Sequence, residues 1–81
     1  MENFLSNCIG IDISKEKLDL FASLDGSDHS LANNDAGIRQ CLALCRKIKP
    51  QLIVLEATGN YEQLVYASLA AEGFPIAVIN P

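Results

Sequence analysis

Two acidic side chains stand among apolar residues, and they are the residues best suited to chemistry. Asp12 lies inside the stretch CIGIDIS that starts at Cys8, and Glu56 directly follows the apolar run LIVL. Paired carboxylates repel each other unless a proton or a cation lies between them, and oxygen ligands suit Mg²⁺ or Mn²⁺. Two such ions, about 3.5 to 4 Å apart, can clamp the reacting oxygens in phosphodiester cleavage. That chemistry usually needs three or four carboxylates.

The cysteines and the single histidine are a weaker candidate site. Cys41 and Cys45 are four residues apart on one face of a predicted helix, where thiols usually act as small hydrophobic side chains. Adding His29 gives three zinc ligands and lacks a fourth. Three cysteines form no paired framework, which favours reduced thiols in a reducing compartment.

Length and composition limit the classes of protein. The 81 residues form at most one small domain or part of one, and 49% hydrophobic with 20% charged residues is typical of a folded chain. A net charge of -4 argues against strong phosphate-backbone binding by this segment alone. The N-terminus has no basic segment followed by a long apolar one, and no apolar run could span a bilayer. We therefore expect a cytoplasmic protein that does not contact a membrane.

Hydrophobic periodicity predicts the first half of the chain. Alternation with a period of two predicts strands over 8–14 and 17–24, a hairpin turn at 25–28 and a short third strand over 29–32. The period then changes to 3.6, which predicts a helix with Asn34 or Asp35 as its N-cap and Pro50 as its stop.

The second half continues with a strand, a helix and a strand. The apolar run over 51–57 predicts a parallel strand buried on both faces, and Thr58 with Gly59 should shape the following turn. Asn60 and Gln63 resemble a capping box, while Gly73 predicts the end of that helix. The last strand falls within 74–80, which completes the order β-β-β-α-β-α-β in the α/β class.

Handedness then predicts the arrangement of the sheet. An antiparallel meander followed by right-handed crossovers gives a mixed sheet with the spatial order 3-2-1-4-5 and both helices on one face. Asp12 should then point to the bare face, beside Glu56 at the carboxyl end of the neighbouring strand. The alternative is that both are strand-end residues that face solvent or cap a turn. Since the fourth strand expects cover on both sides, we also expect more chain or a partner subunit over the bare face.

Three motifs add a family resemblance over nearly the whole chain. GIDISKEKLDL (10–20), VLEATGNYE (54–62) and AVINP (77–81), in this order and spacing, resemble the start of the DEDD transposases of the insertion-sequence 110 and 1111 group. Their N-terminal domain has a RuvC-like ribonuclease-H fold. The resemblance implies that Asp12 and Glu56 are the first two acidic residues of a catalytic tetrad that binds Mg²⁺ or Mn²⁺. It also implies that the full-length protein cleaves and rejoins DNA with the guidance of a structured RNA.

The resemblance also implies that residues 1–81 are a partial RuvC-like catalytic domain, incomplete at the C-terminus. In the family, two further aspartates lie on a helix beyond the segment that matches Asn80 and Pro81, and a C-terminal domain contributes a serine. On this basis we expect the 81 residues to be inactive by themselves, because half of a metal cage leaves too little preorganised charge.

Two other functions stay open at the level of sequence. An actin-like or sugar-kinase ATPase also starts with a similar Gly-Ile-Asp strand, but such proteins place a glycine-containing phosphate turn soon after it, and here the next glycine is Gly26. A non-catalytic oligomerisation module is the second alternative, since a bare sheet face favours self-association.

Overall fold

The first three strands form an antiparallel meander in the computed structural model, which describes residues 6–57 and 59–80. They are β1 (Cys8–Ile13), β2 (Lys17–Ala22) and β3 (Ser27–Ala32). β2 ends before the predicted Leu24 because the following turn starts earlier, with the Gly26 N–H donating to the carbonyl of Ala22 at 2.9 Å. Gly26 has a φ of 72°, a left-handed conformation that glycine adopts without steric cost. β3 therefore starts two residues earlier than predicted.

Helix α1 (Asp35–Ile48) begins at one of the two predicted caps. The Asn34 side chain accepts a hydrogen bond from the Gly37 N–H at 2.8 Å, which satisfies one of the free donors of the first turn. Lys49 is the C-cap that follows the last helical residue. Its φ of 54° is left-handed, and its N–H donates to the carbonyl of Cys45. Asn34 is thus the N-cap, and Asp35 is the first helical residue.

The rest of the chain adds one crossover helix between two parallel strands. The elements are β4 (Leu52–Ala57), α2 (Gln63–Ala71) and β5 (Ile76–Ile79). The predicted capping box is wrong, because Asn60 has a left-handed φ of 66° and α2 begins later, at an N-cap Glu62 that makes no side-chain capping bond. Gly73, with a φ of 81°, ends this helix as predicted.

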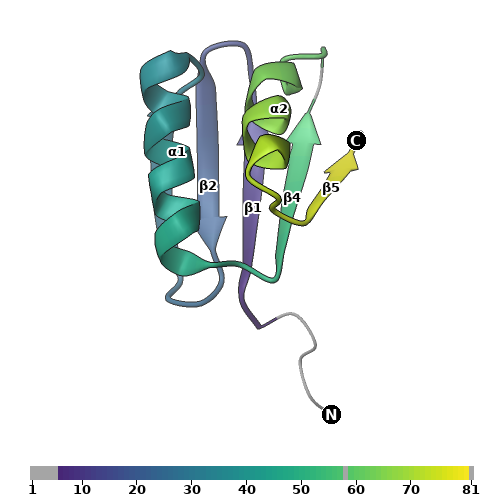
Figure 1. Cartoon of the computed structure of the whole chain (residues 1–81). Coiled ribbons are helices and arrows are strands. Elements are labelled where there is room, and N and C mark those ends of the chain that lie inside the picture. The colour runs from purple at the N-terminus through teal and green to yellow at the C-terminus, as the bar shows by residue number, and fades with distance from the viewer. Residues whose placement is uncertain (1–5, 58, 81) are drawn as a thin grey trace.

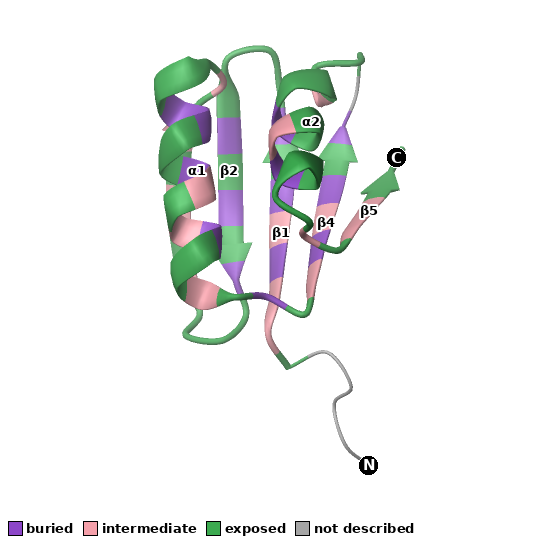
Figure 2. Cartoon of the chain, in the orientation of Figure 1, coloured by how far each residue is buried: buried purple, intermediate pink, exposed green. Residues whose placement is uncertain are grey.

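The five strands form one sheet in the order β3-β2-β1-β4-β5, so the predicted α/β class and strand order are confirmed. Both helices lie on the same face of the sheet (Figure 1). Buried residues alternate with exposed ones along β2 and with intermediate or exposed ones along β1 and β4, as Figure 2 shows. The buried side chains that face the helices make up the core: Ile9, Ile11, Ile13, Leu18, Leu20, Ala22, Ile53, Leu55 and Ala57, with Ile38, Cys41, Cys45, Val65 and Leu69 from the helices.

The opposite side, which we call the open face, presents Gly10, Asp12, Asp19, Phe21, Val54 and Glu56. Among the described residues no helix covers this face (Figure 1). The prediction that β4 is buried on both faces is therefore wrong for this chain: Ile53 and Leu55 are buried, whereas Val54 is half-buried and Glu56 is exposed.

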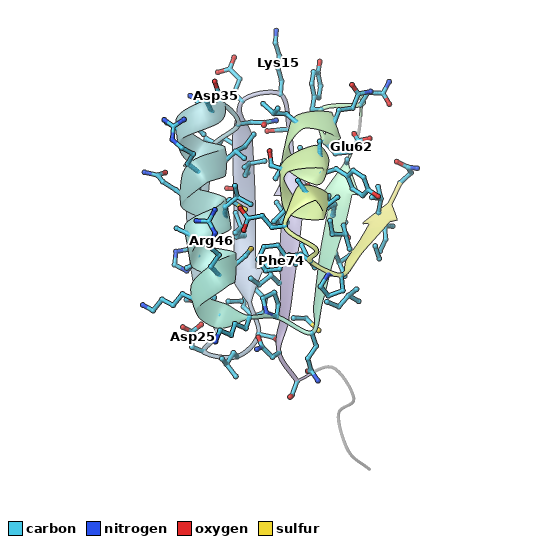
Figure 3. The ribbon with its side chains drawn as sticks, viewed as in Figure 1. Lys15, Asp25, Asp35, Arg46, Glu62 and Phe74 are labelled. Carbon is cyan, nitrogen blue, oxygen red and sulfur yellow. The ribbon has the colours of Figure 1, made fainter. Side chains whose placement is uncertain are left out.

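An ion pair joins the two helices on the covered side. Arg46 Nε donates to Glu72 Oε1 at 2.8 Å, and Arg46 Nη2 donates to Glu72 Oε2 (Figure 3 labels Arg46). The hydrogen bond from Arg46 holds the pKa of the Glu72 carboxyl below its ordinary value. None of the helices among residues 6–57 and 59–80 combines the length and apolar character needed to cross a membrane.

Candidate cation site on the open face

The parallel pairing of β1 with β4 places the two predicted site residues side by side. Asp12 is the register partner of Glu56, so their Cα atoms are neighbours across strands that lie about 4.8 Å apart. Both side chains are exposed on the open face, close to the carboxyl ends of their strands. The structure thus brings the two carboxylates together where open α/β sheets place ligands.

A shallow depression of about 240 Å³ lies in front of this pair. The residues that line it are Gly10, Ile11, Asp12, Asp19, Phe21, Val54 and Glu56. The space next to Gly10 is empty, since a Cβ on this residue would meet no atom within 4 Å. The depression is therefore open to a ligand or to another part of a protein, which is one common reason for a glycine inside a strand.

Asp19 adds a third carboxylate beside this pair, and we call Asp19, Asp12 and Glu56 the carboxylate row. The alternation along β2 turns Asp19 away from Leu18 and Leu20, but its position opposite Asp12 was not predicted. In the hairpin between β1 and β2, the Ser14 N–H donates to the carbonyl of Lys17 at 3.0 Å. Two residues further from the turn on each strand, Asp12 therefore pairs with Asp19. The turn at 15–16 lacks the glycine or asparagine that usually marks a two-residue hairpin loop, so the register of this hairpin could not be predicted. A one-residue slip would have turned Asp19 to the other face.

The electrostatics of the row favour a cation. Asp19, Asp12 and Glu56 lie on three neighbouring strands, and like charges directly opposite each other are destabilising. Their carboxylates form no ion pair or side-chain hydrogen bond with any other residue in 6–57 or 59–80. Within the same described ranges, no three His, Cys, Asp or Glu side chains converge closely enough to hold a metal ion. Among the described residues, these three carboxylates therefore do not form a complete metal cage.

The cysteines and the histidine lie elsewhere. Cys41 and Cys45 are fully buried in the core, where their thiols contact each other, and His29 forms a 3.0 Å hydrogen bond with Ser27. The zinc alternative has no support from this arrangement. Thr58 lies outside the described residues, while Gly59 has a φ of 76° and takes part in the predicted turn after β4.

Comparison with known proteins places this chain in a family. The model of the IS110-type DEDD transposases, described as a transposase family, matches residues 9–81, which include both helices and all of the strands except the first residue of β1, Cys8. The chain belongs to this transposase family. No curated protein matches the chain. Asp12 and Glu56 both fall within the matched range, so the transposase assignment and the carboxylate pair concern the same part of the chain.

Proposed function

We propose that this transposase chain supplies two carboxylates, Asp12 and Glu56, to a divalent-metal site that cleaves and rejoins DNA strands. The observation that carries the proposal is the register of β1 with β4, which sets the two carboxylates next to each other on the open face. The sheet order 3-2-1-4-5 supports a RuvC-like, ribonuclease-H-like core. Guidance by a structured RNA is part of the same proposal and rests on the family resemblance.

The donor set fits Mg²⁺ or Mn²⁺. Both residues offer only carboxylate oxygens, both are exposed, and the row has an excess of negative charge that a cation would relieve. When bound, such ions stabilise charge on the attacking and leaving oxygens of a phosphodiester. Asp12 and Glu56 would hold the ions at the mouth of the sheet, and further carboxylates from outside the described residues would complete the coordination.

The 81 residues should then be inactive alone, since two carboxylates leave most coordination positions to water. The net charge of -4 also means that contacts to DNA and guide RNA need basic surface from elsewhere. A cytoplasmic location stays a prediction.

Calorimetry tests the proposal against the ATPase alternative. Titrating the chain with MnCl₂ should show weak binding, with a dissociation constant on the order of 1 mM or about -4 kcal/mol, because two carboxylates are a minimal ligand set. Titrating with ATP and Mg²⁺ should show no binding beyond that of Mg²⁺ alone. Clear nucleotide binding together with no Mn²⁺ binding would contradict the transposase proposal and support the ATPase alternative.

Self-association is a second candidate role, favoured by exposed apolar side chains on and beside the open face. Phe21 is 48% exposed at the depression, and Ile79 on β5 is 46% exposed opposite Glu56. We propose that two copies associate through this face at high concentration. Added salt should strengthen the association, because it screens repulsion between the two carboxylate rows.

Light scattering checks this prediction with a matched pair of variants. Phe21→Ser should weaken association several-fold, whereas Leu24→Ser should not, because Leu24 is even more exposed at 60% but lies in the turn after β2. A monomer at all concentrations, or equal effects of both substitutions, would rule out the open face as the contact.

A further inference from the structure

One asparagine ties together the two loops that follow the carboxylate strands. Asn33 lies between β3 and α1, and its side-chain nitrogen donates to the Ser14 carbonyl at 3.0 Å and to the Tyr61 carbonyl at 3.2 Å. Its backbone N–H donates to the carbonyl of Glu16 at 3.0 Å. Ser14 follows β1, and Tyr61 lies in the loop between β4 and α2. A single side chain thus bridges loops that are 47 positions apart in the chain, counting from 14 to 61.

Figure 3 shows the two loops at one end of the molecule. Lys15, at the tip of the β1–β2 turn, and Glu62, at the start of α2, both lie at the end to which β1 and β4 run. Asp12 precedes Ser14 by two residues, and Glu56 precedes Tyr61 by five. The contacts of Asn33 are therefore made just beyond the two carboxylates.

The loop after β4 has a conformation that needs such support. Gly59 and Asn60 are consecutive residues with left-handed φ values of 76° and 66°, and a Cβ on Gly59 would come within 3.0 Å of the Tyr61 ring. Left-handed residues other than glycine are uncommon and persist where the surrounding structure holds them. Asn33 bonds to Tyr61, the residue directly after this pair.

Resting on the proposed function, we propose that Asn33 is a positioning residue that sets the separation of the Asp12 and Glu56 carboxylates. The sheet pairs the two Cα atoms, but Asp12 and Glu56 are the last pair but one of the two strands, and only Ile13 and Ala57 pair after them. Metal ligands must be held within about 0.5 Å of the productive geometry. By fixing both loops to one amide group, Asn33 prevents the two strand ends from separating.

Asn7 provides a matched control at the opposite end of the sheet. Its side-chain nitrogen also donates to two carbonyls, those of Ile48 at 3.1 Å and Lys49 at 3.2 Å. Asn7 directly precedes β1 and joins it to the end of α1. Removing either amide therefore deletes two similar hydrogen bonds, but only Asn33 is near the carboxylates.

The test is the Mn²⁺ affinity of the Asn33→Ala and Asn7→Ala variants, measured by calorimetry on folded protein. Asn33→Ala should weaken Mn²⁺ binding about tenfold, the usual effect of losing a residue that supports a metal ligand, and Asn7→Ala should leave it within about twofold. If Asn33→Ala does not fold, Asn33→Gln is measured instead. It keeps both donors one methylene further out, and we expect a smaller loss of affinity.

Three results would overturn the inference. Unchanged Mn²⁺ affinity in a folded Asn33 variant, with binding at Asp12 and Glu56 intact in the unaltered chain, removes the positioning role and leaves the proposed function standing. An equal loss of affinity in Asn7→Ala shows a general loosening of the fold. An unaltered chain that binds no Mn²⁺ overturns the proposed function and this inference together.

Discussion

The Asp12→Asn variant should bind Mn²⁺ at least about tenfold more weakly than the unaltered chain, while its free energy of unfolding stays the same or rises. Removing a direct ligand should cost at least as much as the 10- to 100-fold typical of supporting residues. Asp12 lies between Asp19 and Glu56 in the row, so neutralising it relieves two cross-strand repulsions, worth up to about 1 kcal/mol. Calorimetry and thermal unfolding measure the two effects.

The control for Asp12→Asn is Asp28→Asn. Asp28 is an exposed aspartate on β3 that pairs with Phe21 and so lies on the same face, two strands away from Asp12. Its replacement removes the same charge from the open face and should leave Mn²⁺ affinity within about twofold, because a charge beyond one Debye length of about 8 to 10 Å is largely screened. Equal losses in both variants would mean that Mn²⁺ responds only to the total charge of the face.

Gly37→Ala should destabilise the fold by about 2 kcal/mol, although alanine is the better helix former. Gly37 is buried in the first turn of α1, and a Cβ there would overlap the carbonyl oxygen of Ala32 and come within 2.9 Å of the Ala32 nitrogen. Overpacking against backbone costs about 3 kcal/mol, and the gain in helix propensity offsets about 1 kcal/mol of it. For a domain of this size, the melting temperature should fall by roughly 8 to 16 °C.

Gly10→Ala is the matched control for that substitution. A Cβ at Gly10 meets nothing within 4 Å, and its φ is not left-handed, so alanine should be neutral or stabilise by about 0.5 kcal/mol. Thermal unfolding of the two variants separates the effect of close packing from that of glycine itself. A Gly37→Ala protein as stable as the unaltered chain would contradict the close approach of α1 to the end of β3.

The sequence predicted the sheet because two independent patterns agreed. Alternation in the strands fixed which face is buried, and the right-handed crossover rule fixed the order of the strands. The two patterns together placed Asp12 beside Glu56. Two predictions failed: burial of β4 on both faces, because no described helix covers the open face, and the apparent capping box at Asn60, which depended on an extended backbone, whereas Asn60 is left-handed.

Asp19 and Asn33 show what the sequence could not reveal. The partner of Asp19 depends on a hairpin register that no glycine marks, and the contacts of Asn33 join three loops that are far apart in the chain. Side-chain hydrogen bonds to distant carbonyls have no sequence signature, because any asparagine in a loop can make them. The carboxylate pair could be predicted, whereas the residue that holds its two strand ends could not.

The most direct test of the account is to locate bound Mn²⁺ by the paramagnetic broadening of backbone amide signals in nuclear magnetic resonance. Substoichiometric Mn²⁺ should broaden the amides around Asp12 and Glu56 first, and those of Cys8 and Leu52, at the other end of the same strand pair, much later. Broadening centred on another acidic segment, such as Asp25 and Asp28 near the β2–β3 turn, would contradict the assignment of Asp12 and Glu56 as the cation site.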